Sequence, residues 1–515
     1  PLSGVQVSAG AVSTVTDAAG QAVLVGFEGP DVVVSVRDPE GRVADADLGV
    51  GTLGAAEGVQ WSMQLSGRVH DGARFLGSAA CAGCHGDQHD AWLQTAHAQA
   101  LTAAAGPDVE AVFLAGQSLD SGGLTVSAVV DNDDLVVVLG DGLGGVQRWT
   151  VAGWIGRPAH AAVPWADDDG VAWALPLVWR GGDSSRTGHP DAQPGFVARD
   201  TDRWLDDTGR LQRPPVAESA EAQCFGCHAT GFVLDPQDDG GVEMVATRGE
   251  DRWQEGAVAC EACHGPGSEH RRLAAEGGQQ VIVNPGHLDQ QRALDSCGAC
   301  HGATEAHGRP FAGRGEGGFE PGELLADHTV SDAVRWPGGT AAGPHQQSDE
   351  HGDAGHGAAG LDCNTCHAVH GATGSLRASA TDNTLCLACH SDHDEDSGHL
   401  AHVRIDPEGL TEGGRCIGCH MPGTATESGW GTLSGAGSLG THTFWALAPQ
   451  ETVDVFGESE VLDLGAFPAH ACADCHAWNG WRFGESGVDF PGADGDPTLR
   501  ATQEAHQEGF LEKYP

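Results

Sequence analysis

The pattern Cys-x-x-Cys-His occurs eight times in the chain and uses all 16 of its cysteines. The cysteine pairs are Cys81 and Cys84, Cys224 and Cys227, Cys260 and Cys263, Cys297 and Cys300, Cys363 and Cys366, Cys386 and Cys389, Cys416 and Cys419, and Cys472 and Cys475. The histidines that follow them are His85, His228, His264, His301, His367, His390, His420 and His476. A single Cys-x-x-Cys could belong to a zinc site, a redox dithiol or a short disulfide, but none of these needs a histidine after every second cysteine. The count therefore predicts eight haem c groups, with both thiols of each motif on the porphyrin and the adjacent imidazole on the iron.

A second axial ligand is needed wherever an iron only carries electrons, and histidine and methionine are the candidates. Methionine is scarce, since Met63, Met244 and Met421 are all that the chain contains. Met421 directly follows His420, so it cannot easily reach the opposite face of the same haem. Histidine is plentiful, with 27 residues in total, and is the expected second ligand.

The charge of the chain excludes some partners. The chain has 73 acidic and 26 basic residues, so its formal net charge is -47. Only one of the basic residues, Lys513, is a lysine. Such a surface repels nucleic acid and anionic lipid, so neither is expected as a partner. The acidity serves solubility, or it reflects a salty habitat or bound divalent cations such as calcium that screen the repulsion.

Composition and segment patterns predict a mixed fold in several parts. Hydrophobic residues make up 40% and aromatic residues only 6%, so we expect porphyrins to fill much of the interior. Residues 1–70 read as a small β-sandwich, 71–104 as a first-haem segment and 105–200 as a β-rich insertion. Residues 201–480 are expected to form a loop-rich, mostly short-helical domain with seven haems that packs with the first haem. Residues 481–515 would be an acidic tail, helical near "LRATQEAHQEGFLEKY".

Several strings resemble a known group. "CFGCHATGF", "CEACHGPGSEH", "PGELLADH", "HGAAGLDCNTCHAVHG", "LCLACH" and "CIGCHMP" followed by "THTF" resemble those of bacterial multihaem cytochromes related to the tetrahaem electron carriers of nitrifiers. "CAGCHGDQHDAWLQTAHAQAL" resembles the first-haem segment of that group, and "WIGRPAHAAVPWADDDGVAWALPLVW" its β insertion. The opening "PLSGVQVSAGAVSTVTDAAGQAVL" resembles a carboxypeptidase-regulatory-like, or transthyretin-like, β-sandwich, a module that binds or spaces.

The cytochrome resemblance, which covers roughly residues 76 to 480, implies closely stacked haems with histidine on both sides of each iron. It favours His97, His270, His356, His370 and His442 as second ligands, together with either His399 or His402 in "GHLAH". His287 and His470 are weaker choices. On this reading His264 binds its own haem while His270 reaches the iron of a neighbour.

Two functions remain open at this stage, and electron transfer is preferred. If every iron has two protein ligands, the protein only passes electrons. If one iron is open, it is an octahaem oxidoreductase acting on a small nitrogen or sulfur compound. Pentahaem nitrite reductases use a Cys-x-x-Cys-Lys catalytic haem and hydroxylamine oxidoreductases a cross-linked tyrosine, whereas here all eight motifs end in histidine and the only tyrosine is Tyr514. Haem storage or metal sequestration ranks last, because thioether bonds are permanent.

Location and partners follow from the attachment chemistry. Attachment of haem c is an exported chemistry, so a periplasmic or extracellular location is expected, with a signal peptide already removed before Pro1 and no N-terminal cysteine for a lipid anchor. No run of 18 apolar residues could span a membrane. The expected partners are redox proteins or extracellular electron acceptors. Self-association, up to an extracellular cytochrome filament, is a further hypothesis.

Overall fold

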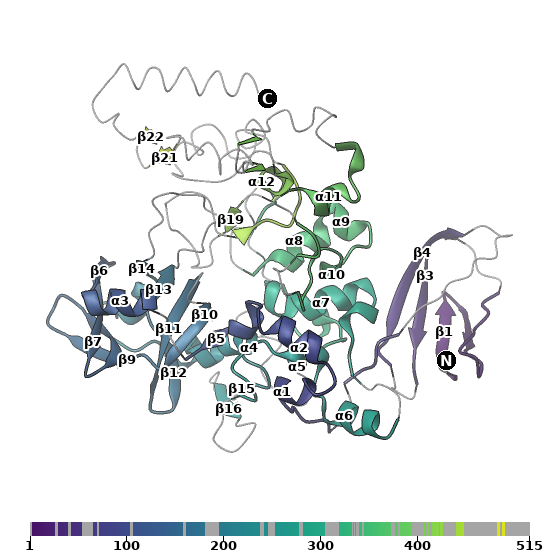
Figure 1. The fold of residues 1–515 in the computed structure, drawn as a ribbon, viewed down its shortest axis with the longest axis horizontal. Helices are drawn as coiled ribbons and strands as arrows, with labels where there is room; N and C mark the ends of the chain where they lie inside the picture. Colours follow the sequence, from purple (N-terminus) through teal and green to yellow (C-terminus); the bar gives the residue numbers. More distant parts are fainter. Residues whose placement is uncertain are drawn as a thin grey trace.

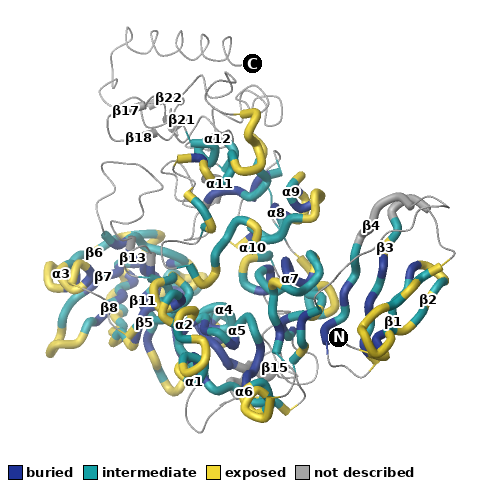
Figure 2. Tube along the Cα trace, turned by 45° about the vertical axis from the view of Figure 1, so that its right-hand side comes forward, coloured by how far each residue is buried: buried dark blue, intermediate teal, exposed yellow. Residues whose placement is uncertain are grey.

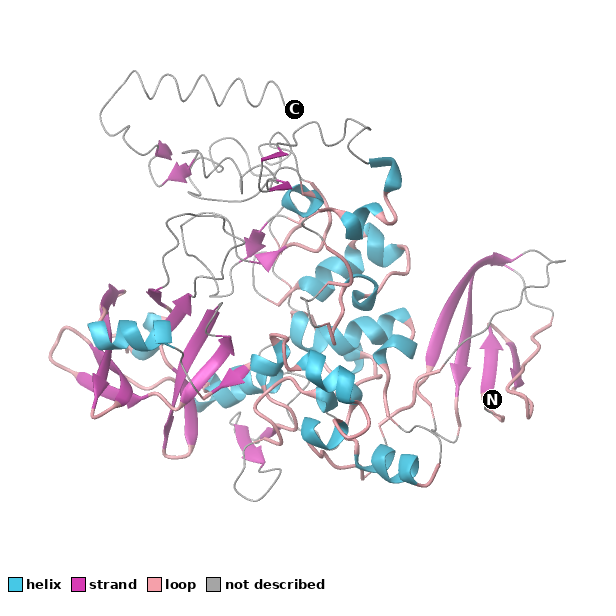
Figure 3. Ribbon diagram, in the orientation of Figure 1, coloured by secondary structure: helices cyan, strands magenta, loops and turns pink. Residues whose placement is uncertain are grey.

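The computed structural model describes about two thirds of the chain. The described residues are 3–25, 29–39, 43–53, 65–69, 72–103, 107–157, 161–180, 195–236, 242–245, 253–277, 282–303, 319–331, 333, 335, 339–341, 345–371, 376–379, 382–393, 405–406, 409–410, 415–421, 423–425, 439–446, 482–484 and 487–489. Strands gather at the N-terminal end and in a second β-rich part, and short helices lie between the two (Figure 1; Figure 3). The predicted mixed fold class is thereby confirmed. The tail after residue 489 lies outside the described residues.

The N-terminal sheet has four antiparallel strands in the order β2-β1-β3-β4. They are β1 (Gln6–Ala9), β2 (Val12–Val15), β3 (Gly29–Arg37) and β4 (Ala46–Leu53). Val5, Val36 and Ala46 form its small buried cluster, with Val7 and Leu65 packed against it. A second sheet that would complete the predicted sandwich is not among the described residues, so the sandwich stays a prediction.

The second β-rich part is built from two sheets that share one core. The first has the order β6-β7-β8-β9 and the second β14-β13-β11-β10-β5, with β12 paired to β11. The bounds are β5 (Leu101–Thr102), β6 (Ser118–Ser121), β7 (Leu124–Asp131), β8 (Asp134–Gly140), β9 (Val146–Thr150), β10 (Gly153–Arg157), β11 (Ala161–Asp168), β12 (Val171–Ala174), β13 (Leu177–Arg180) and β14 (Gly195–Ala198). Helix α3 (Pro107–Ala115) packs on β7. Alternate residues of β7, from Leu124 to Ala128, point into the core, as a half-buried strand requires.

Tryptophans fill this β core. Trp154, Trp173, Trp179 and Trp204 are nearly fully buried and belong to one cluster with residues of both sheets. These large side chains therefore act as ordinary core residues, because their neighbours are other apolar side chains. Trp165 is different, since it packs edge to face against Phe225 beside the second motif.

The remaining described residues form short helices and small hairpins. Their bounds are α1 (Ser78–Cys81), α2 (Gly86–Trp92), η1 (His97–Gln99), η3 (Thr201–Trp204), η4 (Val216–Glu218), the π-helical turn η5 (Glu221–Phe225), α4 (Gly226–His228), β15 (Val233–Pro236), β16 (Val242–Val245), α5 (Cys260–His264), α6 (Ser268–Ala275), η6 (Pro285–His287), α7 (Gln290–His301), η7 (Leu325–Asp327), α8 (Gln347–Asp353), α9 (Gly355–Ala358), α10 (Cys363–Cys366), α11 (Thr384–Leu387), η8 (Ser391–His393), β17 (Ile405–Asp406), β18 (Gly409–Leu410), α12 (Cys416–His420), β19 (Gly423–Ala425), β20 (Leu439–Gly440), β21 (Arg482–Gly484) and β22 (Gly487–Asp489). Within the described residues, no helix has the length and apolar character needed to cross a membrane.

Apolar clusters in this helical part are small. One consists of Trp92, Ala257 and Ala259, and another of Ala299 and Phe319 with partly buried neighbours. In the tube view, α7 is the helix with the longest buried stretch, while α6 is largely exposed (Figure 2).

A charged network joins the N-terminal sheet to α7. The side chain of Arg292 is 8% exposed and lies 2.6 Å from the carboxylate of Asp289, which is 6% exposed. The Asp47 N–H on β4 donates to the same Asp289 carboxylate at 3.0 Å, and the Asp47 carboxylate pairs with Arg37 at 2.9 Å. Because Asp289 also caps the N-terminus of α7, one residue fixes both the helix and its contact with the sheet.

Replacing Arg292 by alanine should loosen this contact. The substitution leaves the Asp289 carboxylate buried without its cation, which costs about 3–5 kcal/mol when a buried ion pair is broken. We expect faster amide hydrogen exchange at Asp47 and earlier proteolysis of residues 3–53. The matched control is Arg272→Ala on α6, where the arginine is half exposed and its two carboxylate contacts contribute under about 1 kcal/mol. Equal effects of the two substitutions would contradict this account.

Candidate haem-binding site

The motifs that the structure describes lie on or directly after short helical turns. The motif of α5 runs from Cys260 to His264, that of α12 from Cys416 to His420, and that of α7 occupies its last turn. In other motifs the backbone N–H of the histidine donates to the carbonyl of the first cysteine, at 2.9 Å for His85 and Cys81. Residues three and four apart lie on the same side of a helix, so both thiols and the imidazole project together. None of the cysteines that the structure describes is in a disulfide.

Five motif histidines face a second histidine from a distant segment. The ring centroids are separated by 6.3 Å for His85 and His270, 6.2 Å for His97 and His301, 6.0 Å for His264 and His370, 6.3 Å for His367 and His442, and 5.9 Å for His356 and His390. The second histidines of these pairs are the five that the resemblance favoured. That each pair binds an iron remains a proposal.

The spacing of the rings fits an iron between them. An imidazole–metal bond of about 2 Å on each side, plus roughly 1 Å from each bonding nitrogen to the centre of its ring, places the two centroids about 6 Å apart. Five pairs at nearly this separation are hard to explain by direct contact between the rings. The residues present therefore fit a haem with two axial histidines.

Backbone carbonyls orient the rings of several motif histidines. His264 Nδ1 donates to the Val283 carbonyl at 2.7 Å, His228 Nδ1 to Ala100 at 3.1 Å and His420 Nδ1 to Phe444 at 3.0 Å. A carbonyl oxygen can only accept, so the proton is on Nδ1 and the lone pair is on Nε2. Ligating histidines commonly make this bond, which fixes the tautomer and raises the basicity of the ring.

Burial favours the neutral form of several of the paired rings. It lowers the pKa of His97, His264, His270, His356 and His370, in each case as the largest cause. For His301 burial and then the neighbouring His97 lower the pKa to about 3. A neutral imidazole has a free lone pair, which is the form that binds a metal.

Thiols of different motifs lie against one another. The thiol of Cys81 lies close to that of Cys260, the thiol of Cys297 close to that of Cys363, and the thiol of Cys386 close to that of Cys416. Cys263 also lies in the electrostatic neighbourhood of Cys297, and Cys389 in that of Cys366. Cys227 of the second motif and Cys300 of the fourth pack in the same cluster with Phe319. Numbered along the chain, the motifs adjoin in the order first, third, fourth, fifth, sixth and seventh, with the second beside the fourth.

Other predicted ligands are placed differently. His287 Nδ1 lies 3.2 Å from Asn284 Nδ2, an amide nitrogen that can only donate. The Asn284 amide is held in this orientation because its Oδ1 accepts from the Gly286 N–H. The neutral His287 ring therefore carries its proton on Nε2. Outside the described residues lie His399, His402, His470, Cys472, Cys475 and His476.

His390 has a second histidine neighbour. His393, three residues further on, lies 6.1 Å from His390, but its Nδ1 is 2.9 Å from the Asp392 carboxylate and its side chain is half exposed. His356 comes from a separate helix, α9, and its ring centroid is 5.9 Å from that of His390. His356 is therefore the better candidate for the second ligand.

Sequence reasoning missed some residues that support the site. Glu350 is 1% exposed and accepts from the N–H of His442 at 2.7 Å and from the Thr441 hydroxyl at 2.5 Å. Phe444 packs edge to face on His356 at 4.2 Å. The string "THTF" was noted only for its histidine, and nothing in the sequence around Glu350 distinguishes it from other acidic residues.

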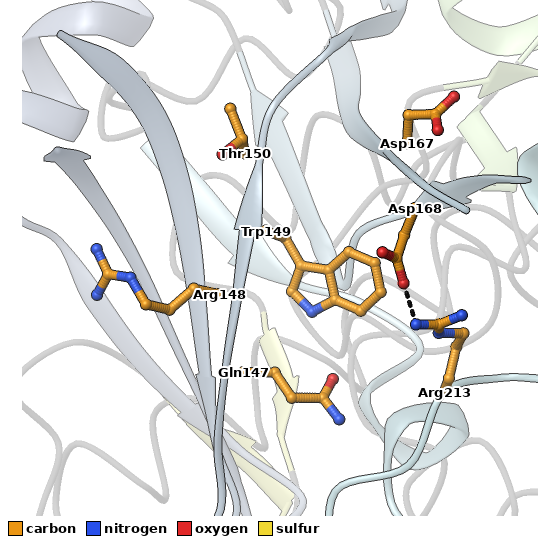
Figure 4. Close-up of a pocket in the computed structure, with 7 residues that line it drawn as sticks. All are labelled: Gln147, Arg148, Trp149, Thr150, Asp167, Asp168 and Arg213. Atoms are coloured by element: carbon orange, nitrogen blue, oxygen red, sulfur yellow. Dashed lines mark hydrogen bonds and ion pairs between the residues drawn. The ribbon is translucent and has the colours of Figure 1, made fainter. Parts of the chain in front are cut away.

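A pocket in the β-rich part has none of the paired histidines in its lining (Figure 4). Its volume is about 430 Å³ and its lining includes Trp149, Asp168 and Arg213. Arg213 is ion-paired with Asp168 and lies 5.7 Å from the ring centroids of both Trp149 and Trp173. The guanidinium thus covers the tryptophans that close the β core, and the pocket carries none of the predicted ligands.

Comparison with known proteins agrees with this geometry. The chain matches the family model "Doubled CXXCH motif" over residues 356–395, and "Cytochrome c554 and c-prime" over residues 80–112 and 206–265. Over these segments the chain is similar to multihaem c-type cytochromes. Both matched models cover segments that contain the motifs described above.

Two solved structures are similar at a low level. One is the outer cell wall cytochrome OcwA, with 18% identity, a TM-score of 0.47, and coverage of 78% of this chain and 84% of the other. The second is the octahaem sulfite reductase MccA of Wolinella succinogenes, with 12% identity, a TM-score of 0.35, and coverage of 75% and 60%. Neither TM-score reaches 0.5, so neither likeness decides the function. No match was found among curated protein sequences.

Removal of His370 tests the pairing directly. In a His370→Ala variant the iron bound by His264 loses its second protein ligand, so the reduced protein should bind one equivalent of carbon monoxide per chain. The control is His287→Ala, which removes a histidine whose ring is held by Asn284 and should add no binding. A carbon monoxide titration of the dithionite-reduced protein, followed by absorbance, measures both. Equal uptake by the two variants would show that His370 is not the ligand.

Proposed function

We propose that the protein conducts electrons through a chain of eight covalently bound haem c groups, with histidine on both sides of the irons. The observation that carries the proposal is the set of five ring pairs with centroids 5.9 to 6.3 Å apart, each pair including a motif histidine. When bound, haem supplies the one-electron chemistry of its iron. Two imidazoles per iron would leave no position for a substrate.

The contacts between thiols support a continuous path. Each thiol is the attachment point of a porphyrin edge, so thiols in contact bring two porphyrin edges close together. The path would begin at the first motif, pass through the third, fourth and fifth, and reach the sixth and seventh. In Figure 1 this sequence of helices extends from α1 and α5 at the bottom of the view, through α7 and α10, to α11 and α12 near the top.

The protein's own residues would set the driving force along this path. Backbone carbonyls that accept from His264, His228 and His420 make these rings better donors, which favours the oxidised iron. A buried carboxylate near an iron acts in the same direction, since negative charge stabilises the more positive state in a low dielectric.

Finer features belong to this proposal as well. The location would be periplasmic or extracellular, since haem c is attached outside the cytoplasm, and the partners would be redox proteins or extracellular acceptors. We retain as proposals the kinship with tetrahaem carriers of nitrifiers, the N-terminal sandwich, the five-part domain division and bound calcium.

We also retain the proposal that copies of the protein assemble into a filament. Electron micrographs at native salt should show linear polymers, and only dispersed particles would remove this element.

An electron paramagnetic resonance spectrum of the oxidised protein, with haem quantified in the same sample, tests the proposed function. We expect eight haems per chain, all of them low-spin, because two imidazoles give a strong ligand field. A high-spin ferric component of about one haem in eight would instead indicate an open iron. The oxidoreductase alternative would then be tested with nitrite, hydroxylamine and tetrathionate as substrates.

A further inference from the structure

Glu261 is a buried carboxylate inside the third motif. It lies on α5 between Cys260 and Cys263, and its side chain is among the largest that are fully buried, with 1% exposure. Burying a carboxylate costs several kcal/mol unless hydrogen bonds compensate for the lost water. Its presence there therefore depends on its partners.

The partners of Glu261 are backbone N–H groups from two segments. Leu76 N donates to both carboxylate oxygens at 2.9 Å, and Gly77 N donates to Oε2 at 2.7 Å. Gly267 N donates to Oε1 at 2.8 Å. Such charge-assisted bonds are stronger than neutral ones. One side chain thus connects α5 with residues far upstream and with the loop that follows the third motif.

These two segments carry the two sides of one histidine pair. Gly77 is the residue before α1, which leads through Cys81 to His85. Gly267 is the residue before α6, which carries His270. The rings of His85 and His270 are 6.3 Å apart with an interplanar angle of 24°. Glu261 is hydrogen-bonded to the start of both helices.

The ring of His270 has little else to hold it. Its Nδ1 is buried and, within the described part of the chain, has no hydrogen-bond partner. His264 and His442, by contrast, are each oriented by a backbone carbonyl. The place of His270 therefore depends on the backbone of α6, which begins at the residue that Glu261 binds.

We propose that Glu261 is a positioning residue that holds His270 opposite His85 by binding the first turns of α1 and α6 to α5. This inference rests on the proposed function, because it takes these two histidines as the ligands of the first haem. Glu261 itself contacts neither ring.

Glu255 provides a comparison within the same region. It accepts from the Ser78 N–H at 2.8 Å and from the Ser78 hydroxyl at 2.5 Å, so it also binds the start of α1. Its described bonds do not include α6. Loss of Glu255 should therefore disturb the attachment of α1 without releasing His270.

The test uses the full-length holoprotein with four substitutions. Glu261→Gln keeps the shape of the side chain but turns an amide NH2 toward backbone N–H donors, so at least one bond is lost. Glu261→Asp keeps the charge and is one methylene shorter, so it cannot reach all three donors. His270→Ala removes the ligand itself. Glu269→Gln, on α6 next to His270, is the control, because the side chain of Glu269 is 25% exposed and bonds only to Arg272 in the described contacts.

The readout is the electron paramagnetic resonance spectrum of each oxidised variant, with and without added imidazole. We expect a high-spin ferric signal equal to one haem per chain in His270→Ala and a large part of that signal in Glu261→Gln. A smaller part is expected in Glu261→Asp, and none in Glu269→Gln. Added imidazole should restore the low-spin spectrum wherever the high-spin signal appears. A general loss of folding would release the second ligands of several haems, so a high-spin signal of no more than one haem per chain distinguishes the two cases.

The outcomes separate the two proposals. If His270→Ala stays fully low-spin, the pairing of His85 with His270 is wrong and the proposed ligation fails with it. If His270→Ala becomes high-spin while both Glu261 variants stay low-spin, only the role of Glu261 is overturned. Loss of haem in the Glu261 variants without an imidazole-sensitive high-spin signal would also overturn it.

Discussion

The pairing of two histidine rings about 6 Å apart is the constraint on which the helical part of this protein depends. A Cys-x-x-Cys-His motif is local and needs only one turn of helix, but the second histidine must come from elsewhere. His85 faces His270, and His97 faces His301, so each pair joins segments far apart in the chain. The small apolar clusters in this region could not by themselves hold such segments together. On the proposed ligation, pairs of histidine ligands would take the place that a hydrophobic core has in other folds.

The β-rich part follows the opposite principle. There, tryptophans such as Trp154 and Trp179 are buried in one continuous core between two sheets. This part can fold around its own side chains, and it borders the haem-binding part where Trp165 meets Phe225. The chain thus has two kinds of interior, and its tryptophans gather in the core of the β-rich part although the aromatic content of the whole chain is low.

The sequence could predict features that depend on residues close together in the chain. It could not predict which distant segments come together in the fold. The motif residues follow from spacing, and five second histidines were selected because of the strings around them. Which motif each of them faces could not be read from the chain, because His356 faces His390 downstream while His370 faces His264 upstream. The sequence also could not predict which carboxylates are buried. Glu261 and Glu350 are two among 73 acidic residues, and only the backbone N–H groups brought to them by tertiary structure distinguish them.

The most direct test of the account is an experimental map of the iron positions, obtained from anomalous scattering at the iron absorption edge in a crystal of the holoprotein. The account predicts an iron midway between the rings of each of the five pairs, with successive irons in the order of the first, third, fourth, fifth, sixth and seventh motifs. Irons displaced from these ring pairs, or an order in which the first and third motifs are not neighbours, would contradict it.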